Sequence, residues 1–181
     1  MNLILYVILL LVELFFLIGL SVYIIGLLYS SIMGAPYVPT SKKNIHDILM
    51  KAGLKKGQSF LELGSGDGRI VREAVKKYGV TGTGIDINLL LIFLSRFLAT
   101  HEHLKNIEFK RENIFKTDFS QAHVIYFFLM PELIKKIAVR FDKEVKKGTL
   151  IISHGFKIIG WENKLIDQID TQPFSTFFYR R

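Results

Sequence analysis

The chain of 181 residues has no cysteine, one tryptophan and four prolines. The absence of cysteine excludes disulfide bonds and thiolate metal ligands, and it agrees with a reducing compartment. His101 and His103 flank Glu102 without a third metal ligand beside them, so we predict no metal site. The basic residues form no arginine-rich tract and no aromatic RNA-binding signature, so we expect no nucleic-acid partner.

Charge is nearly absent from the first part of the chain. Between Leu3 and Tyr29 only Glu13 is charged at neutral pH. A helix of roughly 27 residues is about 40 Å long, more than the roughly 30 Å of hydrocarbon in a bilayer. No Lys or Arg precedes this segment, it is too long for a signal-peptide core, and no clear A-x-A site follows. We therefore predict an uncleaved transmembrane anchor over residues 1–30.

Positive charge follows the anchor and predicts its orientation. Lysines stand at positions 42, 43, 51, 55 and 56. The positive-inside rule then places the rest of the chain in the cytoplasm. The formal net charge is +8, and without Glu13 it is +9 for the part after the anchor. Lys and Arg gain on the order of 1 kcal/mol each beside an anionic leaflet, which accounts for this basic balance.

The remainder divides into a pre-domain segment, residues 31–58, and a domain, residues 59–181. Pro36 and Pro39 keep the start of the segment extended, and Thr40 or Ser41 can cap a helix that begins near Lys42. The domain alternates apolar strand patterns with helical ones, which predicts an α/β fold with a parallel sheet and helices on both faces. The expected strands are 59–63, 82–86, 107–110, 122–129 and 149–153, the expected helices are 69–78, 88–98 and 132–145, and 164–169 with 174–179 form a final hairpin.

The helix expected over residues 88–98 has almost no polar face. Eight of its positions are leucine, isoleucine or phenylalanine, and Ser95 and Arg96 are the main exceptions. A helix that is apolar all round is normally buried, so deep burial is one interpretation. The alternative is that part of this helix enters the lipid interface beside the anchor.

Three alternate glycines follow the first expected strand. Gly64, Gly66 and Gly68 predict a tight turn whose backbone can approach a ligand, with a structural turn as the alternative. A dinucleotide fingerprint has its third glycine at the sixth position, where this chain has Arg69. Asp86 ends the next expected strand about 20 residues later, where a carboxylate can accept hydrogen bonds from both hydroxyls of a ribose.

Two further carboxylates flank this loop and indicate the charge of its ligand. Glu62 precedes the glycines and Asp67 lies between them. They would repel a pyrophosphate at close range and attract a cation. S-adenosylmethionine carries an adenosine group, a sulfonium and an ammonium, so it is the predicted cofactor.

With these motifs in place, the chain resembles the membrane-anchored class I methyltransferases that include the ATP synthase c-subunit and adenine nucleotide translocase lysine methyltransferases. The resemblance covers nearly the whole chain and rests on the apolar anchor and on segments 36–40, 63–70, 84–86, 128–133, 153–156 and 161–162. It implies a Rossmann-like class I methyltransferase sheet, S-adenosylmethionine as cofactor and protein-lysine methylation.

The chain departs from the family pattern at two positions. Glu62 stands where the family often has Asp, and Asn113 stands where an Asp commonly binds the adenine amino group. The Asn carbonyl can still accept that hydrogen bond. The predicted cofactor-binding residues are Glu62, Gly64, Ser65, Gly66, Asp67, Gly68, Asp86, Ile87, Asn113 and Ile114.

Four residues in the family-like segments are candidates for the acceptor side of a catalytic site: Tyr37, Pro131, His154 and Trp161. His154 also fits a hydrogen-bonded structural role, and Trp161 also fits a cap on the core. A lysine acceptor must lose a proton, which desolvation at a membrane surface favours without a dedicated base.

The predicted function is therefore S-adenosylmethionine-dependent methylation of a lysine in a protein in or near the membrane. One alternative is methylation of a lipid or small molecule, and another is an anchored scaffold that binds the cofactor without catalysis. The sequence leaves the acceptor, the number of methyl groups and the oligomeric state open.

Overall fold

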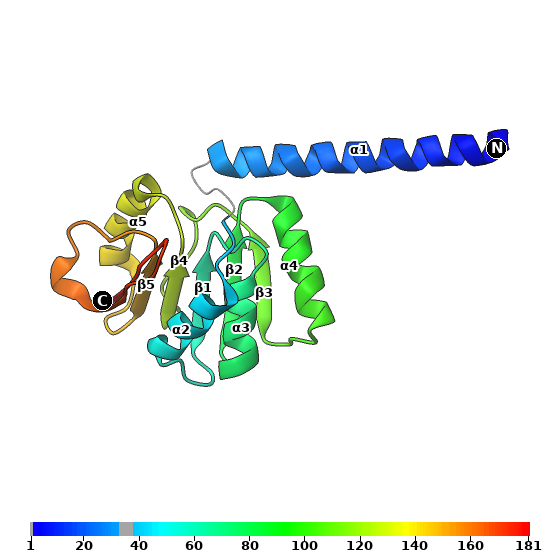
Figure 1. Cartoon of the computed structure of the whole chain (residues 1–181). Coiled ribbons are helices and arrows are strands. Elements are labelled where there is room, and N and C mark those ends of the chain that lie inside the picture. The colour runs from blue at the N-terminus through cyan, green and yellow to red at the C-terminus, as the bar shows by residue number, and fades with distance from the viewer. Residues whose placement is uncertain (1, 33–37) are drawn as a thin grey trace.

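The structure is a computed structural model that describes residues 2–32 and 38–181. A seven-stranded sheet lies at its centre, and a long N-terminal helix extends beyond the domain (Figure 1). The strand order is β3-β2-β1-β4-β5-β7-β6. The strands are β1 (Ser59–Leu63), β2 (Thr81–Asp86), β3 (Ile107–Arg111), β4 (Val124–Phe127), β5 (Leu150–His154), β6 (Leu165–Ile169) and β7 (Thr176–Arg180).

The first five strands are parallel, and the last two are antiparallel to their neighbours. β1 pairs with β2 and β4, β2 pairs with β3, and β4 pairs with β5, all in parallel. β7 lies between β5 and β6 and runs antiparallel to both, so the C-terminal hairpin is confirmed and also completes the sheet. The chain order reverses between β1 and β4, and ligands of open α/β sheets bind at such a switch point.

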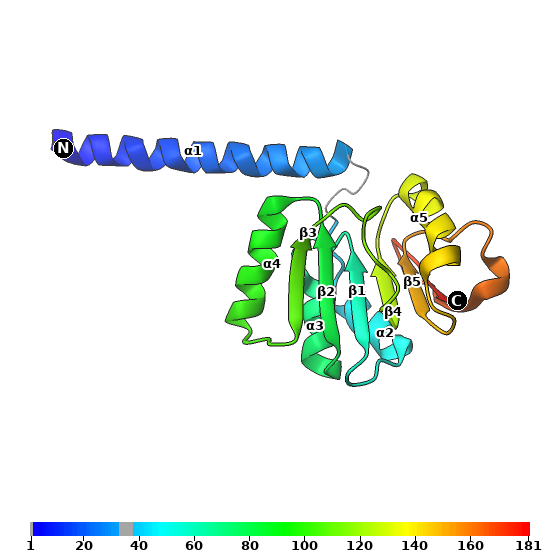
Figure 2. The same cartoon turned by 180° about the vertical axis from the view of Figure 1, so that it is seen from behind.

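Helices cover both faces of the sheet. α2, α3 and α4 lie on one face and α5 lies on the other (Figures 1 and 2). Their bounds are α2 (Lys42–Ala52), α3 (Arg69–Tyr78), α4 (Leu89–His101) and α5 (Pro131–Glu144), and a short 3-10 helix, η1, spans Glu162–Lys164. The predicted cap of α2 is confirmed, because the Ser41 side chain accepts a hydrogen bond from the Asn44 amide at 3.2 Å.

The expected 122–129 strand is shorter in the structure. β4 begins at Val124 and ends at Phe127, and Pro131 begins α5 after an extended Met130. Proline has no amide hydrogen for a sheet ladder, but it suits the first turn of a helix. The loop between β4 and α5, at the carboxyl edge of the sheet, therefore consists of Phe128, Leu129 and Met130.

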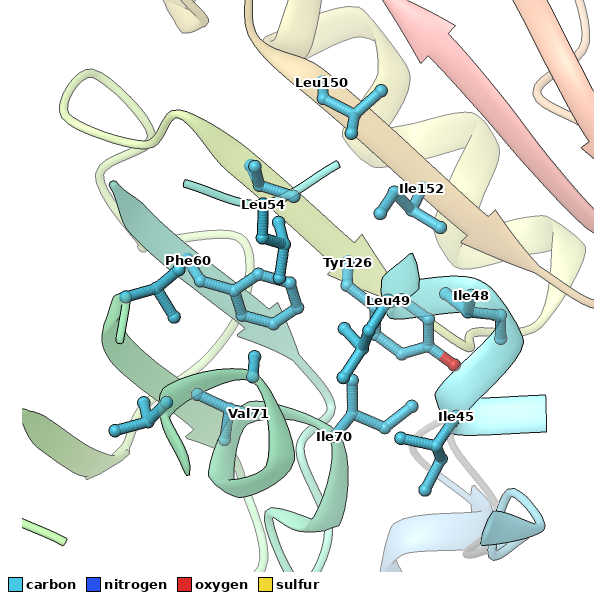
Figure 3. Close-up of a cluster of buried hydrophobic side chains, with 14 of the residues drawn as sticks. Ile45, Ile48, Leu49, Leu54, Phe60, Ile70, Val71, Tyr126, Leu150 and Ile152 are labelled. Atoms are coloured by element: carbon cyan, nitrogen blue, oxygen red, sulfur yellow. The ribbon is translucent and has the colours of Figure 1, made fainter. Parts of the chain in front are cut away.

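The core on the α2 side joins the pre-domain segment to the sheet. Ile45, Ile48 and Leu49 of α2 are buried against Phe60 and Tyr126 of the sheet (Figure 3). The boundary expected at residue 59 separates α2 from the first strand along the sequence. In the folded chain, α2 packs on the sheet and belongs to the same hydrophobic core.

Helix α1 (Leu3–Ile32) has the expected position and apolar character. Its stretch Leu3–Gly26 is long and apolar enough to cross a membrane, and its most apolar part is not buried in the domain. Residues 33–37, which include Pro36 and Tyr37, lie outside the described part of the chain.

The helix expected over residues 88–98 is present as α4. The interpretation that this helix is deeply buried is wrong. Phe93 is 56% exposed and Phe97 is 67% exposed. α4 packs on β3 and β2, at one edge of the sheet, so the domain covers only one of its faces.

Candidate functional site

A pocket lies at the carboxyl ends of β1, β2 and β4, at the switch point of the sheet. Six of the residues predicted to bind the cofactor line it: Glu62, Gly64, Ser65, Gly66, Asp67 and Asp86. Eight further residues complete the lining: Val38, Pro39, Thr40, Arg69, Ile70, Leu91, Tyr126 and Phe128. The glycine loop after β1 therefore forms one wall, and the segment before α2 lies across it.

The glycine loop is a compact turn between β1 and α3. The Ser65 amide donates to the Ile85 carbonyl and the Gly68 amide donates to the Ser65 carbonyl, both at 2.8 Å. Gly68 has a φ of 72°, and a Cβ there would lie 2.3 Å from a ring carbon of Phe109. Only glycine fits this position without a shift of the Phe109 ring or the loop.

Asp86 lies at the end of β2 and holds the loop from the other side. One carboxylate oxygen accepts the Gly66 amide and the other accepts the Asn88 amide, each at 2.8 Å. Burial raises the pKa of Asp86, although these backbone hydrogen bonds act in the opposite direction. A carboxylate has about four acceptor positions, so two amides leave capacity for two hydroxyl donors.

Glu62 is buried on β1, where its carboxylate accepts a hydrogen bond from the Val71 amide at 3.0 Å. Burial raises the pKa of Glu62 well above its ordinary value, and the charges of Asp67 and Asp86 add to this rise. Such a carboxylate gains from a cationic ligand group, which would reduce both the desolvation penalty and the repulsion.

The sequence predicts that Glu62 and Asp67 both attract a cationic ligand. In the structure, Asp67 is already paired with Arg69, so Glu62 is the one of the two carboxylates without an ion pair among the described residues. The Arg69 guanidinium contacts the Asp67 carboxylate at 2.8 Å. Burial alone would raise the pKa of Asp67, but the hydrogen bonds and the charge of Arg69 outweigh burial and lower the pKa. Arg69 also donates to the Thr40 carbonyl at 3.2 Å. This pair therefore fastens the segment before α2 to the loop.

Two buried hydroxyls in the pocket wall lack a partner among the described residues. The Ser65 hydroxyl makes no hydrogen bond there, and the Tyr126 hydroxyl lies beside the Thr40 side chain without reaching hydrogen-bond geometry. Burial of an unpaired polar group costs about 1–3 kcal/mol. The pocket thus offers these unpaired hydroxyls, the Asp86 carboxylate and the buried Glu62 carboxylate. This set fits a ligand that carries hydroxyls and a positive charge, as S-adenosylmethionine does.

The other predicted cofactor residues lie outside the lining of this pocket. Gly68 caps α3 behind the loop, and Ile87 accepts a 3.3 Å hydrogen bond from Arg111 through its carbonyl. The side-chain carbonyl of Asn113 accepts the Phe115 amide at 2.9 Å in the turn after β3. Ile114, next in that turn, is half-buried against the core. The Glu112 amide donates to the Asp86 carbonyl at 3.0 Å, which keeps this turn beside β2.

An apolar hollow adjoins the pocket. Val38 and Phe128 border both spaces, and the hollow is completed by Leu129, Met130, Phe156 and Phe174. Pro131 follows Met130 directly and starts α5, so its segment reaches the hollow although Pro131 does not line it. None of the described acceptor-side candidates, Pro131, His154 and Trp161, lines the hollow itself.

His154 lies behind this hollow and is buried. Its Nδ1 is 2.8 Å from the Thr176 hydroxyl, and its ring centroid is 4.6 Å from that of Phe128. Burial lowers the pKa of His154 to about 4, so the ring is neutral near pH 7. With these contacts, the His154 ring can hold the Phe128 ring in place.

Trp161 is not brought to either space. It is 2% exposed and packs against Phe141 and Tyr179, and its indole nitrogen donates to Asp142 at 3.3 Å. This placement matches the alternative of a core cap. Tyr37 lies outside the described residues.

Sequence reasoning missed Tyr126 and Phe128, although the apolar β4 pattern ends at the correct edge. Their alternation with neighbours could have indicated that one face of this strand points toward the loop. Val38 and Thr40 belong to the family-like segment 36–40, but their position over the pocket depends on the Arg69 contact and could not be predicted.

Comparison with known proteins agrees with this geometry. Residues 62–165, more than half of the chain, match the model of the ANTKMT methyltransferase domain. A protein-lysine N-methyltransferase of Saccharolobus islandicus (strain REY15A) is 32% identical over 145 residues, which cover 75% of this chain and 85% of that protein. The human ATP synthase c-subunit lysine N-methyltransferase is 30% identical over 127 residues, which cover 70% of this chain and 54% of that protein.

Among solved structures, an RNA methyltransferase from Salinibacter ruber in complex with S-adenosyl-L-homocysteine superposes with a TM-score of 0.76 at 28% identity. The match covers 79% of this chain and 93% of that chain. A methyltransferase from Geobacter sulfurreducens, at 18% identity and a TM-score of 0.59, shares the fold. The chain thus belongs to the ANTKMT methyltransferase domain family of class I S-adenosylmethionine-dependent methyltransferases.

Proposed function

We propose that the chain methylates a lysine side chain of a protein that lies in or beside the membrane crossed by α1. The observation that carries this proposal is the junction of two spaces at Phe128, one lined by buried carboxylates and the other apolar. The relatives from S. islandicus and human, which are named as lysine N-methyltransferases, support the acceptor. The apolar helix α1 supports the membrane location.

The residues of the pocket have distinct binding roles in this proposal. When bound, S-adenosylmethionine supplies a methyl group activated by a sulfonium. Asp86 accepts the two ribose hydroxyls, Glu62 compensates the ligand's positive charge, and the Ser65 hydroxyl gains a partner that it lacks among the described residues. Ile87, Asn113 and Ile114, beside Asp86, complete the adenosine side.

The apolar hollow supplies what a lysine acceptor needs. A lysine with an ordinary pKa of about 10.4 must be neutral to act as a nucleophile. The hollow is lined by aromatic and aliphatic side chains, which disfavour the ammonium by desolvation. Phe128 borders both spaces and is thus positioned to align the amine with the donor, and alignment of reacting groups is the main task in such a transfer.

His154 acts in this proposal as a positioning residue. Its ring is neutral, buried and engaged by Thr176, so it holds the Phe128 ring instead of accepting the lysine proton. Gly155 allows the same contact, because a Cβ there would lie 2.6 Å from a ring carbon of Phe128. The proton leaves to water before transfer. Pro131 starts α5 at this edge and places Met130 in the hollow.

The anchor is proposed to confine enzyme and acceptor to one surface. Lysines after α1 favour a cytoplasmic domain by the positive-inside rule, at a prokaryotic inner membrane or a mitochondrial membrane. Confinement raises the effective concentration of a membrane-associated acceptor without any new contact.

The test is to incubate native membranes with the full chain and methyl-labelled S-adenosylmethionine, and to identify the labelled species by mass spectrometry. We expect a labelled lysine in a membrane-associated protein, and less label with the Asp86→Ala variant as control at a donor concentration that does not saturate the wild type. Label found in a lipid or in RNA would contradict the proposal that the methyl acceptor is a protein. Cofactor binding without label in any fraction would favour a non-catalytic scaffold.

A further inference from the structure

Both faces of α4 are largely apolar. The buried face consists of Leu91, Ile92, Ser95 and Ala99. The outward face presents Leu89, Phe93, Leu94 and Phe97, which are 42%, 56%, 40% and 67% exposed. Helices on the surface of a soluble domain normally turn their polar residues outward. A contiguous apolar stripe of this kind marks an interaction site.

The start of this helix is attached to α1. The Asn88 side chain caps α4 by accepting the Leu90 and Leu91 amides, at 3.0 and 3.4 Å. The same side chain donates to the Gly26 carbonyl of α1 at 2.9 Å. A Cβ at Gly26 would lie 3.2 Å from Leu90, so the backbone of α1 packs closely against α4.

The place of this attachment is informative, because Gly26 is also the last residue of the stretch that can span a membrane. α4 therefore starts at the level where α1 would leave the bilayer. In Figures 1 and 2, α4 runs across the direction of α1 and is the part of the domain nearest to the free N-terminal end of α1. The sheet lies on the opposite side of α4.

We propose that the outward face of α4 rests in the headgroup and acyl boundary of the bilayer that α1 crosses. A helix across the spanning direction lies in the plane of the surface, as interfacial helices do. The domain would then have two membrane contacts, α1 through the bilayer and the stripe Leu89, Phe93, Leu94 and Phe97 on its surface. This inference rests on the proposed membrane span of α1.

The residue at the start of α4, Asn88, links α1 to the cofactor pocket. The Asn88 backbone amide donates to Asp86, while its side chain binds Gly26. Asp86 is thus two hydrogen bonds from α1. Seating α4 on the bilayer would hold the carboxyl edge of the sheet at a constant height above the surface.

A bilayer suits this stripe better than a second copy of the chain, because the stripe continues from a segment that is itself apolar enough for lipid. The polar end of α4 agrees with this assignment. Thr100 and His101 follow the stripe on the same side and are exposed, which marks where the apolar surface ends.

The absence of cysteine allows a direct test on the full chain. Phe97→Cys creates a single labelling site for an environment-sensitive fluorophore. In vesicles of zwitterionic and anionic lipid we expect blue-shifted emission and loss of intensity on adding lipids with a quencher near the headgroup. Val139→Cys is the matched control, since Val139 is 59% exposed on α5, the helix on the other face of the sheet. Its label should remain aqueous.

A third variant, Leu10→Cys in α1, separates the two proposals. A label in lipid at position 10 and in water at position 97 would overturn the α4 contact and leave the span intact. A label in water at both positions would overturn both. A label at position 97 shielded from lipid and aqueous quenchers alike would indicate a protein partner, such as a second copy, and would also overturn the lipid assignment.

Discussion

Asp86 and Gly66 are joined by a hydrogen bond of 2.8 Å, in which the glycine amide donates to the carboxylate. The end of β2 thereby holds the tip of the loop that follows β1. Both groups line the same pocket, so the acid that we propose as the ribose acceptor also shapes the loop around it.

Asp86→Ala is expected to weaken binding of S-adenosylmethionine by about 1–3 kcal/mol, or about 5- to 150-fold in Kd, because ribose hydroxyls and loop amides lose their acceptor. Calorimetry on the folded variant measures this change. Asp118→Ala is the control, since Asp118 is exposed and bonds within its own turn at Ser120. Donor affinity equal to wild type in a folded Asp86→Ala variant would refute the site.

Glu62→Gln should stabilise the protein without cofactor while weakening donor binding. Burial raises the pKa of Glu62 above 4.5, so the folded chain binds this proton more tightly than the unfolded chain. The free energy of unfolding therefore falls as pH rises from 4.5 through the raised pKa, and Gln, which keeps an acceptor for Val71, avoids that loss.

The measurements are Tm and donor Kd of wild type and Glu62→Gln across the same pH range. Wild-type affinity should improve as the carboxyl ionises, because only the charged form attracts a cation, and the variant should lack this improvement. Parallel pH profiles for both proteins would show that Glu62 does not titrate in the pocket.

His154 should contribute to acid sensitivity. Its pKa is lowered from 6.5 to about 4 by burial, so the unfolded chain binds the proton first as pH falls. The corresponding loss, roughly 3 kcal/mol at 1.36 kcal/mol per unit, is expected between pH 6.5 and 4. Urea unfolding of wild type and His154→Gln over this range should show a steeper loss in wild type.

The pH dependence of the reaction provides a separate test of His154. A neutral positioning residue gives no step in kcat near pH 6.5, whereas a general base with an ordinary histidine pKa does. His154→Gln should retain partial activity through its hydrogen bond to Thr176. A step near pH 6.5 that disappears in this variant would identify His154 as a base.

Phe128→Ala should lower kcat/KM for a lysine peptide by about tenfold, equivalent to about 1.4 kcal/mol, because the acceptor loses alignment. Trp161→Phe is the matched aromatic comparison. It removes the indole hydrogen bond to Asp142 and should lower the free energy of unfolding by about 1–3 kcal/mol, with kcat/KM unchanged. Steady-state kinetics and urea unfolding of both variants distinguish the two roles, and a kinetic defect in a stably folded Trp161→Phe protein would contradict them.

Removal of residues before about position 30 should spare donor binding and slow methylation of the native membrane target. The described pocket lining begins at Val38, so the cofactor site remains, while confinement to the surface is lost. Rates are compared in the same vesicles, with a soluble lysine peptide as control. Equal rates on the membrane target with and without α1 would favour a soluble acceptor.

Local pattern was enough to identify the strands, the glycine loop and Asp86. Gly64, Gly66 and Gly68 directly after an apolar run define a turn through backbone sterics, which act within a few residues. Parallel strands expose their carboxyl ends at one edge, so Glu62 and Asp86 could be assigned to one site before their contacts were known. The apolar composition of α1 is likewise a local property.

The contacts between distant segments depended on the tertiary structure. Thr40 reaches the pocket because Arg69 binds its carbonyl, and Trp161 enters the core because Asp142 and Tyr179 lie beside it. The exposure of Phe93 and Phe97 follows from the position of α4 at the edge of the sheet. Periodicity shows that a helix is apolar, but only the packing of the whole chain decides which of its faces is covered.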